Sequence, residues 1–341
     1  MLFLHIVIAG RDEDYICRIT SWIRENRPDQ FKVSAFTKKE SFRKYMKASG
    51  KEADIVLAEE EFLAPEQLQE KNVIILGQPE KDEYENLQYI EKYQPAPAIL
   101  SNILSLISMW NKELVKWNKA GKSEIILCIS PEPHLKSTLA LWLALISSKH
   151  VYMNFESFPF YLLKPDNQQF SRNISDVLYH IKASRGNIGI VLESAVYTDS
   201  TGINIVPPMD NPGDLWELSE KENEIFLKSL SLWARYTRII ADIEWNACSR
   251  TIQWIQAASR IFIPFCESQP HQLVRFRDMI MAISDESIQK IRWIYSGNSS
   301  NRLPDNFGSI SVITSLNVFP YNWRETDLNC TFSNQLEELL R

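Results

Sequence analysis

Residues 125–146, IILCISPEPHLKSTLALWLALI, carry the clearest structural pattern in the chain. An apolar run rich in β-branched residues comes first, and this composition is typical of a buried strand. Prolines at 131 and 133 end the run, because proline has no N–H group to donate to a sheet. From Leu139 the sequence is again apolar as far as Ile146. The stretch therefore predicts a strand, a short loop and a buried helix, in that order.

Downstream of this stretch, short apolar segments alternate with helical patterns. The predicted strands are HVYMNF (150–155), GINIVPP (202–208), RIIADIE (238–244), RIFIPF (260–265), IRWIYSG (291–297) and ISVITS (310–315). The segment NIGIVLES (187–194) fits a strand or a helix, and periodicity does not decide between them. This alternation predicts a doubly wound α/β domain with a mainly parallel sheet.

The first hundred residues repeat the alternation on a smaller scale. Their predicted strands are HIVIAG (5–10), FKVSAF (31–36), ADIVLAEE (53–60), NVIILGQ (72–78) and LQYIEKY (87–93). A stripe from Ile99 to Trp117 at helical spacing follows, and it either packs on the first sheet, which we favour, or forms a dimer seam. We therefore expect two doubly wound α/β domains, residues 1–118 and 119–341.

Composition limits the classes of function. The chain of 341 residues has a net charge of −6 and no long basic block, which argues against nonspecific DNA binding. Its five cysteines are scattered without metal-binding spacing, as expected of buried thiols in a reducing cytoplasm. The longest apolar run, residues 139–146, is far shorter than the ~20 residues that span a bilayer. We expect a cytoplasmic protein that reaches a membrane only through partners.

Four positions at predicted strand ends in the first domain decide its chemistry. Asp12 follows the first strand after the cation Arg11, Glu59 ends the third, Gly77 follows the fourth and Lys92 follows the fifth. This arrangement resembles a response-regulator receiver over roughly the first 110 residues. In receivers, acidic metal ligands, an acceptor Asp, a hydroxyl residue and a Lys fill these positions. The resemblance implies a flavodoxin-like fold that has lost phosphotransfer, with a Glu59–Lys92 pair that either mimics the phosphorylated state or is an ordinary ion pair.

The loop and helix start at 130–138 resemble the phosphate-binding loop of the ParA/MinD family, in its deviant Walker A form. In that family a lysine and glycines occupy the places that residues 131–135 (PEPHL) hold here. Proline donates no N–H, and Glu132 places a negative charge where polyphosphate would bind. Lys136, Ser137 and Thr138 keep the family's positions for a phosphate lysine, a Mg²⁺ hydroxyl and a helix-start threonine. The same three residues also fit ordinary helix capping.

Further family positions follow in the same order along the chain. Asn154 and Glu156 stand where the family has an acidic pair, and Asp242 stands where it has the Mg²⁺-contacting aspartate. Asn298, after a later strand, is a candidate adenine contact, and a loop that closes the core is the alternative that we favour for this position. The segment GINIVPPMDNPGDLWEL (202–218) resembles the TadZ/CpaE branch of this family, whose members pair a receiver-like domain with an ATPase-like domain.

The resemblance implies a localisation or assembly scaffold of a pilus or secretion system, with weak or absent ATP binding and no efficient hydrolysis. If ATP and Mg²⁺ bind, Lys136, Ser137, Thr138, Asp242 and Asn298 are the expected ligand residues, with Ser137 and Asp242 on the metal. Expected partners are a second copy of the chain and assembly proteins at the inner face of the membrane, and no specific nucleic acid. The alternatives are an ATP-dependent dimerisation switch and a signalling adaptor that uses the receiver-like domain.

Overall fold

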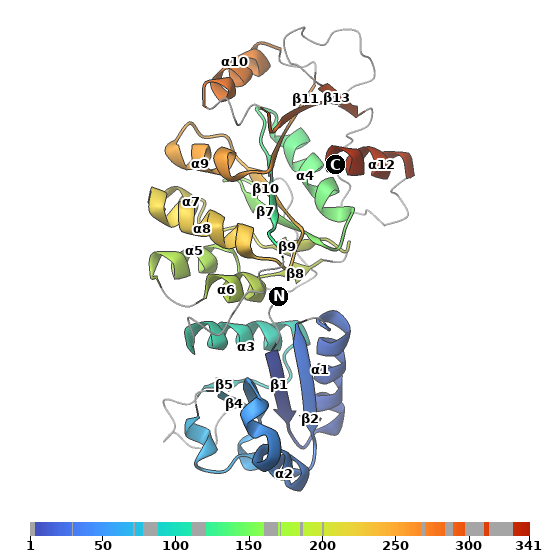
Figure 1. Ribbon diagram of the computed structural model, residues 1–341, viewed down its shortest axis with the longest axis vertical. Coiled ribbons are helices and arrows are strands. Elements are labelled where there is room, and N and C mark those ends of the chain that lie inside the picture. The colour runs from blue at the N-terminus through green and yellow to red at the C-terminus, as the bar shows by residue number, and fades with distance from the viewer. Residues whose placement is uncertain are drawn as a thin grey trace. The chain divides into compact units, whose positions relative to one another are not determined.

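The computed structural model describes most of the chain, which divides by its contacts into two units (Figure 1). The described residues are 4–28, 30–70, 72–77, 88–110, 121–159, 170, 172–184, 187–199, 201–266, 270–283, 289–296, 310–313 and 330–341. Unit 1 comprises residues 1–119 and 185–194, and unit 2 comprises residues 120–184 and 195–341. This division differs from the limits expected from the sequence mainly in the segment 185–194.

Unit 1 is built on a five-stranded parallel sheet in the order β2-β1-β3-β4-β5. Its strands are β1 (Leu4–Ala9), β2 (Phe31–Phe36), β3 (Ile55–Ala58), β4 (Val73–Leu76) and β5 (Tyr89–Ile90). The order reverses between β1 and β3, as in a doubly wound sheet. All five strands lie in segments that the sequence predicts as strands.

Helices cover both faces of this sheet. Successive side chains of β1 point to opposite faces, and because all of them are apolar and buried, each face needs a cover. The helices of the N-terminal stretch are α1 (Glu13–Asn26), α2 (Lys39–Ser49) and α3 (Ala96–Trp110). Ile6 and Ile8 pack in one core cluster with residues of α1 and α3, whereas Val7 packs in a second cluster with Phe42 of α2. Ile99, Ile103 and Ile107 of the predicted stripe are therefore buried in this core, as favoured from the sequence. The rest of the stripe, as far as Trp117, lies outside the residues whose side chains are described.

The ambiguous segment NIGIVLES is helical and completes unit 1. It forms α6 (Ile188–Ser194), which packs against α3. Ile190 is fully buried and belongs to the same core cluster as α1 and α3. A helix contributed from far along the sequence is thus part of the first unit.

Unit 2 contains an eight-stranded sheet in the order β13-β12-β11-β6-β10-β7-β9-β8. Its strands are β6 (Glu124–Cys128), β7 (His150–Phe155), β8 (Tyr197–Thr198), β9 (Asn204–Val206), β10 (Arg238–Ile243), β11 (Arg260–Phe265), β12 (Ile291–Ser296) and β13 (Ile310–Ile313). The pairs are parallel except for β8 with β9, at the edge. The fold class predicted from the sequence, two doubly wound α/β units, is confirmed.

Helices lie on both sides of the second sheet (Figure 1). They are α4 (Pro133–Leu145), α5 (Ile174–Lys182), α7 (Gly213–Trp216), α8 (Glu220–Leu232), α9 (Ser249–Ala257), α10 (Pro270–Met281) and α12 (Cys330–Leu339). Helix α4 packs on one face together with Leu336 and Leu340 at the end of the chain. On the other face Phe155 packs against Phe226 of α8 and Trp254 of α9. Strand β6 is therefore central and covered on both faces.

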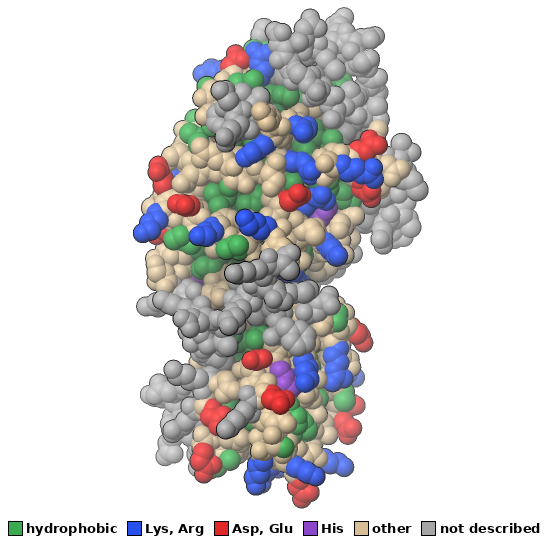
Figure 2. Space-filling model, viewed as in Figure 1, with side chains coloured by type: hydrophobic (Ala, Val, Ile, Leu, Met, Phe, Trp, Pro, Cys, Tyr) green, Lys and Arg blue, Asp and Glu red, His purple; other side chains and the backbone are tan. Residues whose placement is uncertain are grey.

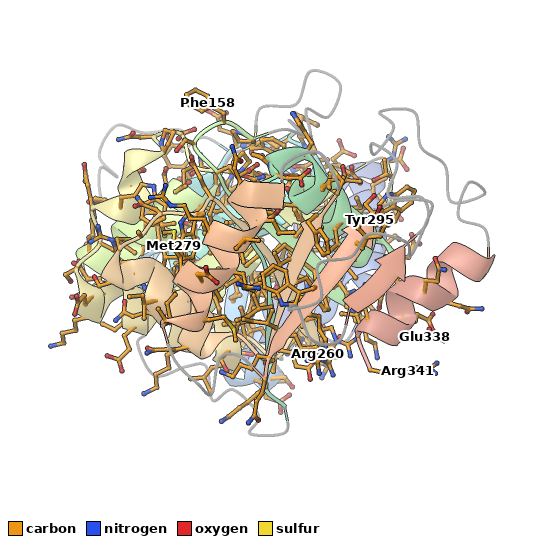
Figure 3. The ribbon with its side chains drawn as sticks, turned by 90° about the horizontal axis from the view of Figure 1, so that it is seen from above. Phe158, Arg260, Met279, Tyr295, Glu338 and Arg341 are labelled. Atoms are coloured by element: carbon orange, nitrogen blue, oxygen red, sulfur yellow. The ribbon has the colours of Figure 1, made fainter. Side chains whose placement is uncertain are left out.

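Two surface features complete the description. Arg260 donates a 2.8 Å hydrogen bond to the carbonyl of Arg341, and both residues are labelled in Figure 3. This contact holds the end of the described chain against β11.

On the face drawn in Figure 2, acidic and basic side chains of the described residues are interspersed in each unit. Within the described ranges, the helices are all too short or too polar to cross a lipid bilayer.

Candidate functional site

The loop between β6 and α4 is held by its own side chains. Ser130 Oγ accepts from the Glu132 amide at 2.9 Å and donates to the Pro264 carbonyl at 2.6 Å. The Glu132 carboxylate accepts from the Cys266 amide at 3.0 Å and from the Cys266 thiol at 2.9 Å. Helix α4 begins at Pro133. Proline suits the first position of a helix, because the N–H group it lacks has no partner within the helix there. The loop is thus fixed by contacts with the end of β11.

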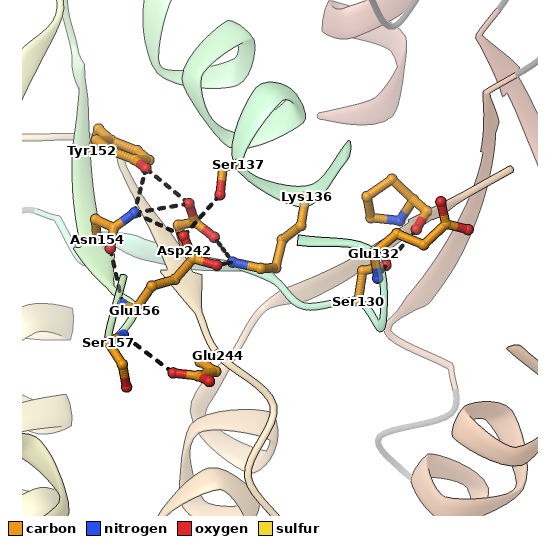
Figure 4. A network of polar contacts seen from close by, with 11 residues as sticks. Ser130, Glu132, Lys136, Ser137, Tyr152, Asn154, Glu156, Ser157, Asp242 and Glu244 are labelled. Carbon is orange, nitrogen blue, oxygen red and sulfur yellow. Dashed lines mark hydrogen bonds and ion pairs between the residues drawn. The ribbon is translucent and has the colours of Figure 1, made fainter. Parts of the chain in front are cut away.

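Lys136 lies in the first turns of α4, with a side chain that is only 1% exposed. Its ammonium group forms an ion pair with Glu156 Oε1 at 2.7 Å and a second ion pair with Asp242 Oδ1 (Figure 4). The parallel pairing places Asp242 of β10 beside Cys128 of β6 and Asn154 of β7. The carboxyl ends of these strands meet directly under the start of α4, so the lysine lies between two carboxylates.

Neutral side chains bind the remaining oxygens of the two carboxylates. Ser137 donates to Glu156 Oε2 at 3.1 Å. Tyr152 donates its hydroxyl to Asp242 Oδ2 at 2.8 Å, and the Asn154 amide donates to the same oxygen at 3.2 Å. Together with Lys136 these residues form what we call the Lys136 cluster: Lys136, Ser137, Tyr152, Asn154, Glu156 and Asp242.

The electrostatics of the Lys136 cluster follow from burying two carboxylates with one ammonium. Burial alone would lower the pKa of Lys136, but the adjacent charges of Asp242 and Glu156 outweigh it and raise that pKa. Burial and the charge of Asp242 raise the pKa of Glu156 above its ordinary value of 4.5, against the effect of Lys136. Burial and Asp242 also raise the pKa of Tyr152. Lys136 therefore stays charged, and Glu156 is protonated more readily than an ordinary glutamate.

These residues do not fit a bound nucleotide with Mg²⁺. A phosphate site needs free backbone N–H groups, a free lysine and a free hydroxyl. Here two loop residues are prolines, the Glu132 N–H is bound by Ser130, and Lys136 and Ser137 both bind Glu156. The predicted metal ligand Asp242 has both carboxylate oxygens engaged. The protein's own carboxylates occupy the interactions that phosphate would make.

The predicted site residues are only partly brought together. Lys136, Ser137 and Asp242 share the Lys136 cluster, while Thr138 is buried beside them in α4. Asn298 lies outside the described residues. Sequence reasoning missed Tyr152 as a ligand of Asp242; its position two residues before Asn154, on the same face of a strand, was the available signal.

In unit 1 a cleft of about 990 Å³ lies at the carboxyl ends of the strands, lined by the predicted receiver-like residues. Lys92 forms an ion pair with Glu59 at 2.8 Å, and the Glu59 side chain is 9% exposed. The Arg11 amide also donates to Glu59, at 3.2 Å. The expected Glu59–Lys92 pair is thus present.

The other two receiver-like positions serve local structure. Asp12 caps α1 by accepting from the Tyr15 amide at 3.0 Å. Gly77 has φ +113°, and a Cβ there would come within 3.6 Å of the Lys92 side chain. At Gly10 the space is smaller, because an added Cβ would lie 2.5 Å from Glu59 Oε1. Gly77 is therefore required by its positive φ, and Gly10 leaves room for the Glu59 carboxylate.

Comparison with known proteins gives similarities at the level of solved structures. No family model matches the chain, and no curated protein matches it. A plasmid partition protein from Borrelia burgdorferi is similar with a TM-score of 0.43 and 16% identity, over 64% of this chain and 96% of that one. A ParA family ATPase from Chlorobium tepidum TLS is similar with a TM-score of 0.39 and 15% identity, over 52% of this chain and 76% of that one. McdA from Cyanthece is similar with a TM-score of 0.36 and 16% identity, over 51% of this chain and 72% of that one.

Replacing Lys136 tests whether the cluster supports the fold. In Lys136→Met the two buried carboxylates lose the one cation that pairs with them among the described residues, so the free energy of unfolding at pH 7 should fall by about 3–5 kcal/mol in urea denaturation. Lys149→Met, at an exposed lysine of the same unit, is the control and should change little. A loss below ~1 kcal/mol in Lys136→Met would contradict a structural role for the cluster.

The raised pKa of Glu156 predicts a pH dependence. Below pH 4.5 the carboxyl is protonated in both the folded and the unfolded chain, so its contribution to stability is complete. As pH rises through the raised folded pKa, the folded chain must ionise a buried carboxyl and that contribution is lost. Glu156→Gln should therefore gain stability relative to the natural chain as pH increases from 4.5. Urea denaturation across pH, with the exposed Glu224→Gln as control, measures this; a constant difference would contradict it.

The Glu59–Lys92 pair predicts that unit 1 accepts no phosphoryl group. Lys92 already neutralises the carboxylate at the acceptor position. After incubation with acetyl phosphate and Mg²⁺, the intact mass of the chain should be unchanged. A stoichiometric gain of one phosphoryl group on a unit 1 peptide would show that the receiver chemistry survives.

Proposed function

We propose that the chain is a noncatalytic scaffold of the TadZ/CpaE type, which localises or assembles a pilus or secretion system without a nucleotide cycle. The observation that carries the proposal is the position of Lys136, 1% exposed and paired with Glu156 and Asp242. A nucleotide switch works by exchanging ligands at this lysine. In this chain its ligands are parts of the core.

The cost of opening the cluster supports the proposal. Turning Lys136 toward a triphosphate would leave two buried carboxylates without a cation, and uncompensated buried charge costs about 3–5 kcal/mol. Binding would also bring polyphosphate close to Glu132. The gain from phosphate contacts would have to exceed both costs, with prolines in place of two amide donors.

Unit 1 fits the same function. The Glu59–Lys92 ion pair places a cation on the acidic residue at the acceptor position, so we expect that the unit needs no kinase and offers no phosphorylation signal. This supports a constant docking module in place of a signalling adaptor. The cellular role in pilus or secretion assembly, the assembly partners and self-association through unit 2 rest on the sequence resemblance.

The second candidate is an ATP-dependent dimerisation switch of the ParA/MinD type. It is favoured by one observation, that the fold gathers Lys136, Ser137 and Asp242 at a single site. In this case ATP would displace Glu156 from the lysine, and the nucleotide would control association of two copies.

A titration with Mg-ATP separates the two candidates. A ligand at 100 times its Kd stabilises a protein by about 2.7 kcal/mol, which a thermal shift detects readily. The scaffold proposal predicts no shift at millimolar Mg-ATP and an unchanged elution volume in size-exclusion chromatography. Mg²⁺ with inorganic phosphate serves as the control for ionic effects. A saturable shift with ATP, lost in Lys136→Met, would establish the switch and remove the scaffold proposal.

A further inference from the structure

Unit 1 contains a strongly basic segment within an acidic chain. Residues 32–52, which include most of β2 and all of α2, carry seven basic and two acidic side chains, whereas the whole chain has 37 basic and 43 acidic ones. Apolar and small residues separate the basic ones, so the sequence shows no continuous basic block. The fold decides whether these charges come together.

Three of the basic residues share the outer face of α2. Phe42 and Met46 of this helix pack in a core cluster of unit 1, so the opposite side of the helix faces solvent. Arg43, Lys44 and Lys47 are exposed. Lys47 lies four residues after Arg43 and three after Lys44, and side chains at these spacings are neighbours on a helix surface. The three cations therefore lie side by side.

Two further lysines extend this face. Lys38 is exposed at the N-cap of α2. Lys32 is exposed on β2, four residues before Phe36, so both side chains point to the same face of the sheet. Phe36 contacts Tyr45 of α2, with ring centroids 4.9 Å apart, so this is the face that α2 covers. We call the five residues the α2 basic face: Lys32, Lys38, Arg43, Lys44 and Lys47.

The protein itself does not neutralise the α2 basic face. Among the residues that the structure describes, none of its five side chains forms an ion pair. The neighbouring Lys39 differs, because it is paired with Glu61 at 2.9 Å. Surface cations without partners in their own chain are available to an external anion.

The outer edge of β2, beside this face, is partly closed to strand pairing. The Val33 carbonyl accepts from Arg24 Nη2 at 2.8 Å, and the Phe31 amide donates to the Arg27 carbonyl at 3.2 Å. An added strand would need these two backbone groups. The structure therefore favours recognition through side-chain charge over recognition by strand addition.

We propose that the α2 basic face binds an anionic lipid surface directly. Each lysine or arginine near such a surface strengthens binding about fivefold. The long side chains let charges at different heights on the helix reach the headgroups together. The chain would then contact lipid itself, in addition to the contacts through partners that we expect from the sequence.

Two observations favour lipid over nucleic acid at this face. In the described part of the chain, the large apolar side chains that are exposed all lie outside residues 32–52, so the face offers no platform on which bases could stack. Glu40, in the first turn of α2, opposes a phosphate at the helix start. The choice of a membrane also rests on the proposed function, which places the chain at the cell envelope.

Co-sedimentation of the full chain with lipid vesicles tests the proposal. At about 0.1 M salt the chain should bind vesicles rich in phosphatidylglycerol and should not bind vesicles of phosphatidylcholine alone. It should be released at about 1 M salt, where the screening length falls to about 3 Å. Combining Arg43→Gln, Lys44→Gln and Lys47→Gln should lower the partition coefficient about 100-fold.

The matched control makes the same change of charge in unit 2. It combines Lys149→Gln, Lys221→Gln and Lys228→Gln, at three exposed lysines, and should leave the partition coefficient nearly unchanged. Circular dichroism verifies that both variants fold, and the salt dependence of the natural chain tests the proposal without any variant.

Three results would overturn the proposal. They are a natural chain that does not bind the anionic vesicles, equal losses in the two sets of variants, and tighter binding to a DNA duplex of mixed sequence that is lost in the α2 variant. The last result would assign the face to nucleic acid. Because the vesicle assay contains no nucleotide and no assembly protein, its failure is distinguishable from failure of the scaffold proposal in the Mg-ATP titration.

Discussion

The ion pairs of Lys136 with Glu156 and Asp242 organise the second unit. A lysine this deeply buried is stable only when carboxylates compensate its charge, and buried carboxylates are stable only with a cation and hydrogen-bond donors. The register of β6, β10 and β7 brings the two acids to one edge, where α4 begins. Ser137, Tyr152 and Asn154 then satisfy the oxygens that Lys136 leaves. A phosphate at this lysine would have to displace the same contacts that complete the core.

Both units use this device at the same place in the fold. In doubly wound sheets the carboxyl ends of the strands form the usual ligand crevice. In unit 1 that crevice contains Lys92 paired with Glu59, and in unit 2 it contains Lys136 paired with Glu156 and Asp242. In each case a carboxylate of the protein supplies the negative charge beside the lysine that a phosphoryl group or a nucleotide would supply in other proteins.

Phe158, 90% exposed just beyond β7, projects from the molecule in Figure 3 and leaves an apolar side chain at the surface near this edge.

Much of the fold could be predicted from the sequence, because buried parallel strands give apolar runs that are hard to mistake. Lys136, Ser137 and Asp242 could be named as candidates only through the family resemblance, and the structure brings the three together at the start of α4. Their mutual pairing could not, because it depends on strand register and side-chain rotamers that a linear pattern does not contain. The assignment of α6 to unit 1 could not be predicted either. Its apolar sequence shows that it is buried but does not show which core it enters.

The most direct test of the central claim is a crystal structure of the chain grown with Mg²⁺ and a nonhydrolysable ATP analogue. The account predicts that Lys136 Nζ still lies between Glu156 and Asp242, with no nucleotide against residues 130–135. Ordered triphosphate density along that loop, with Lys136 turned onto it and Mg²⁺ bound by Ser137, would contradict the account.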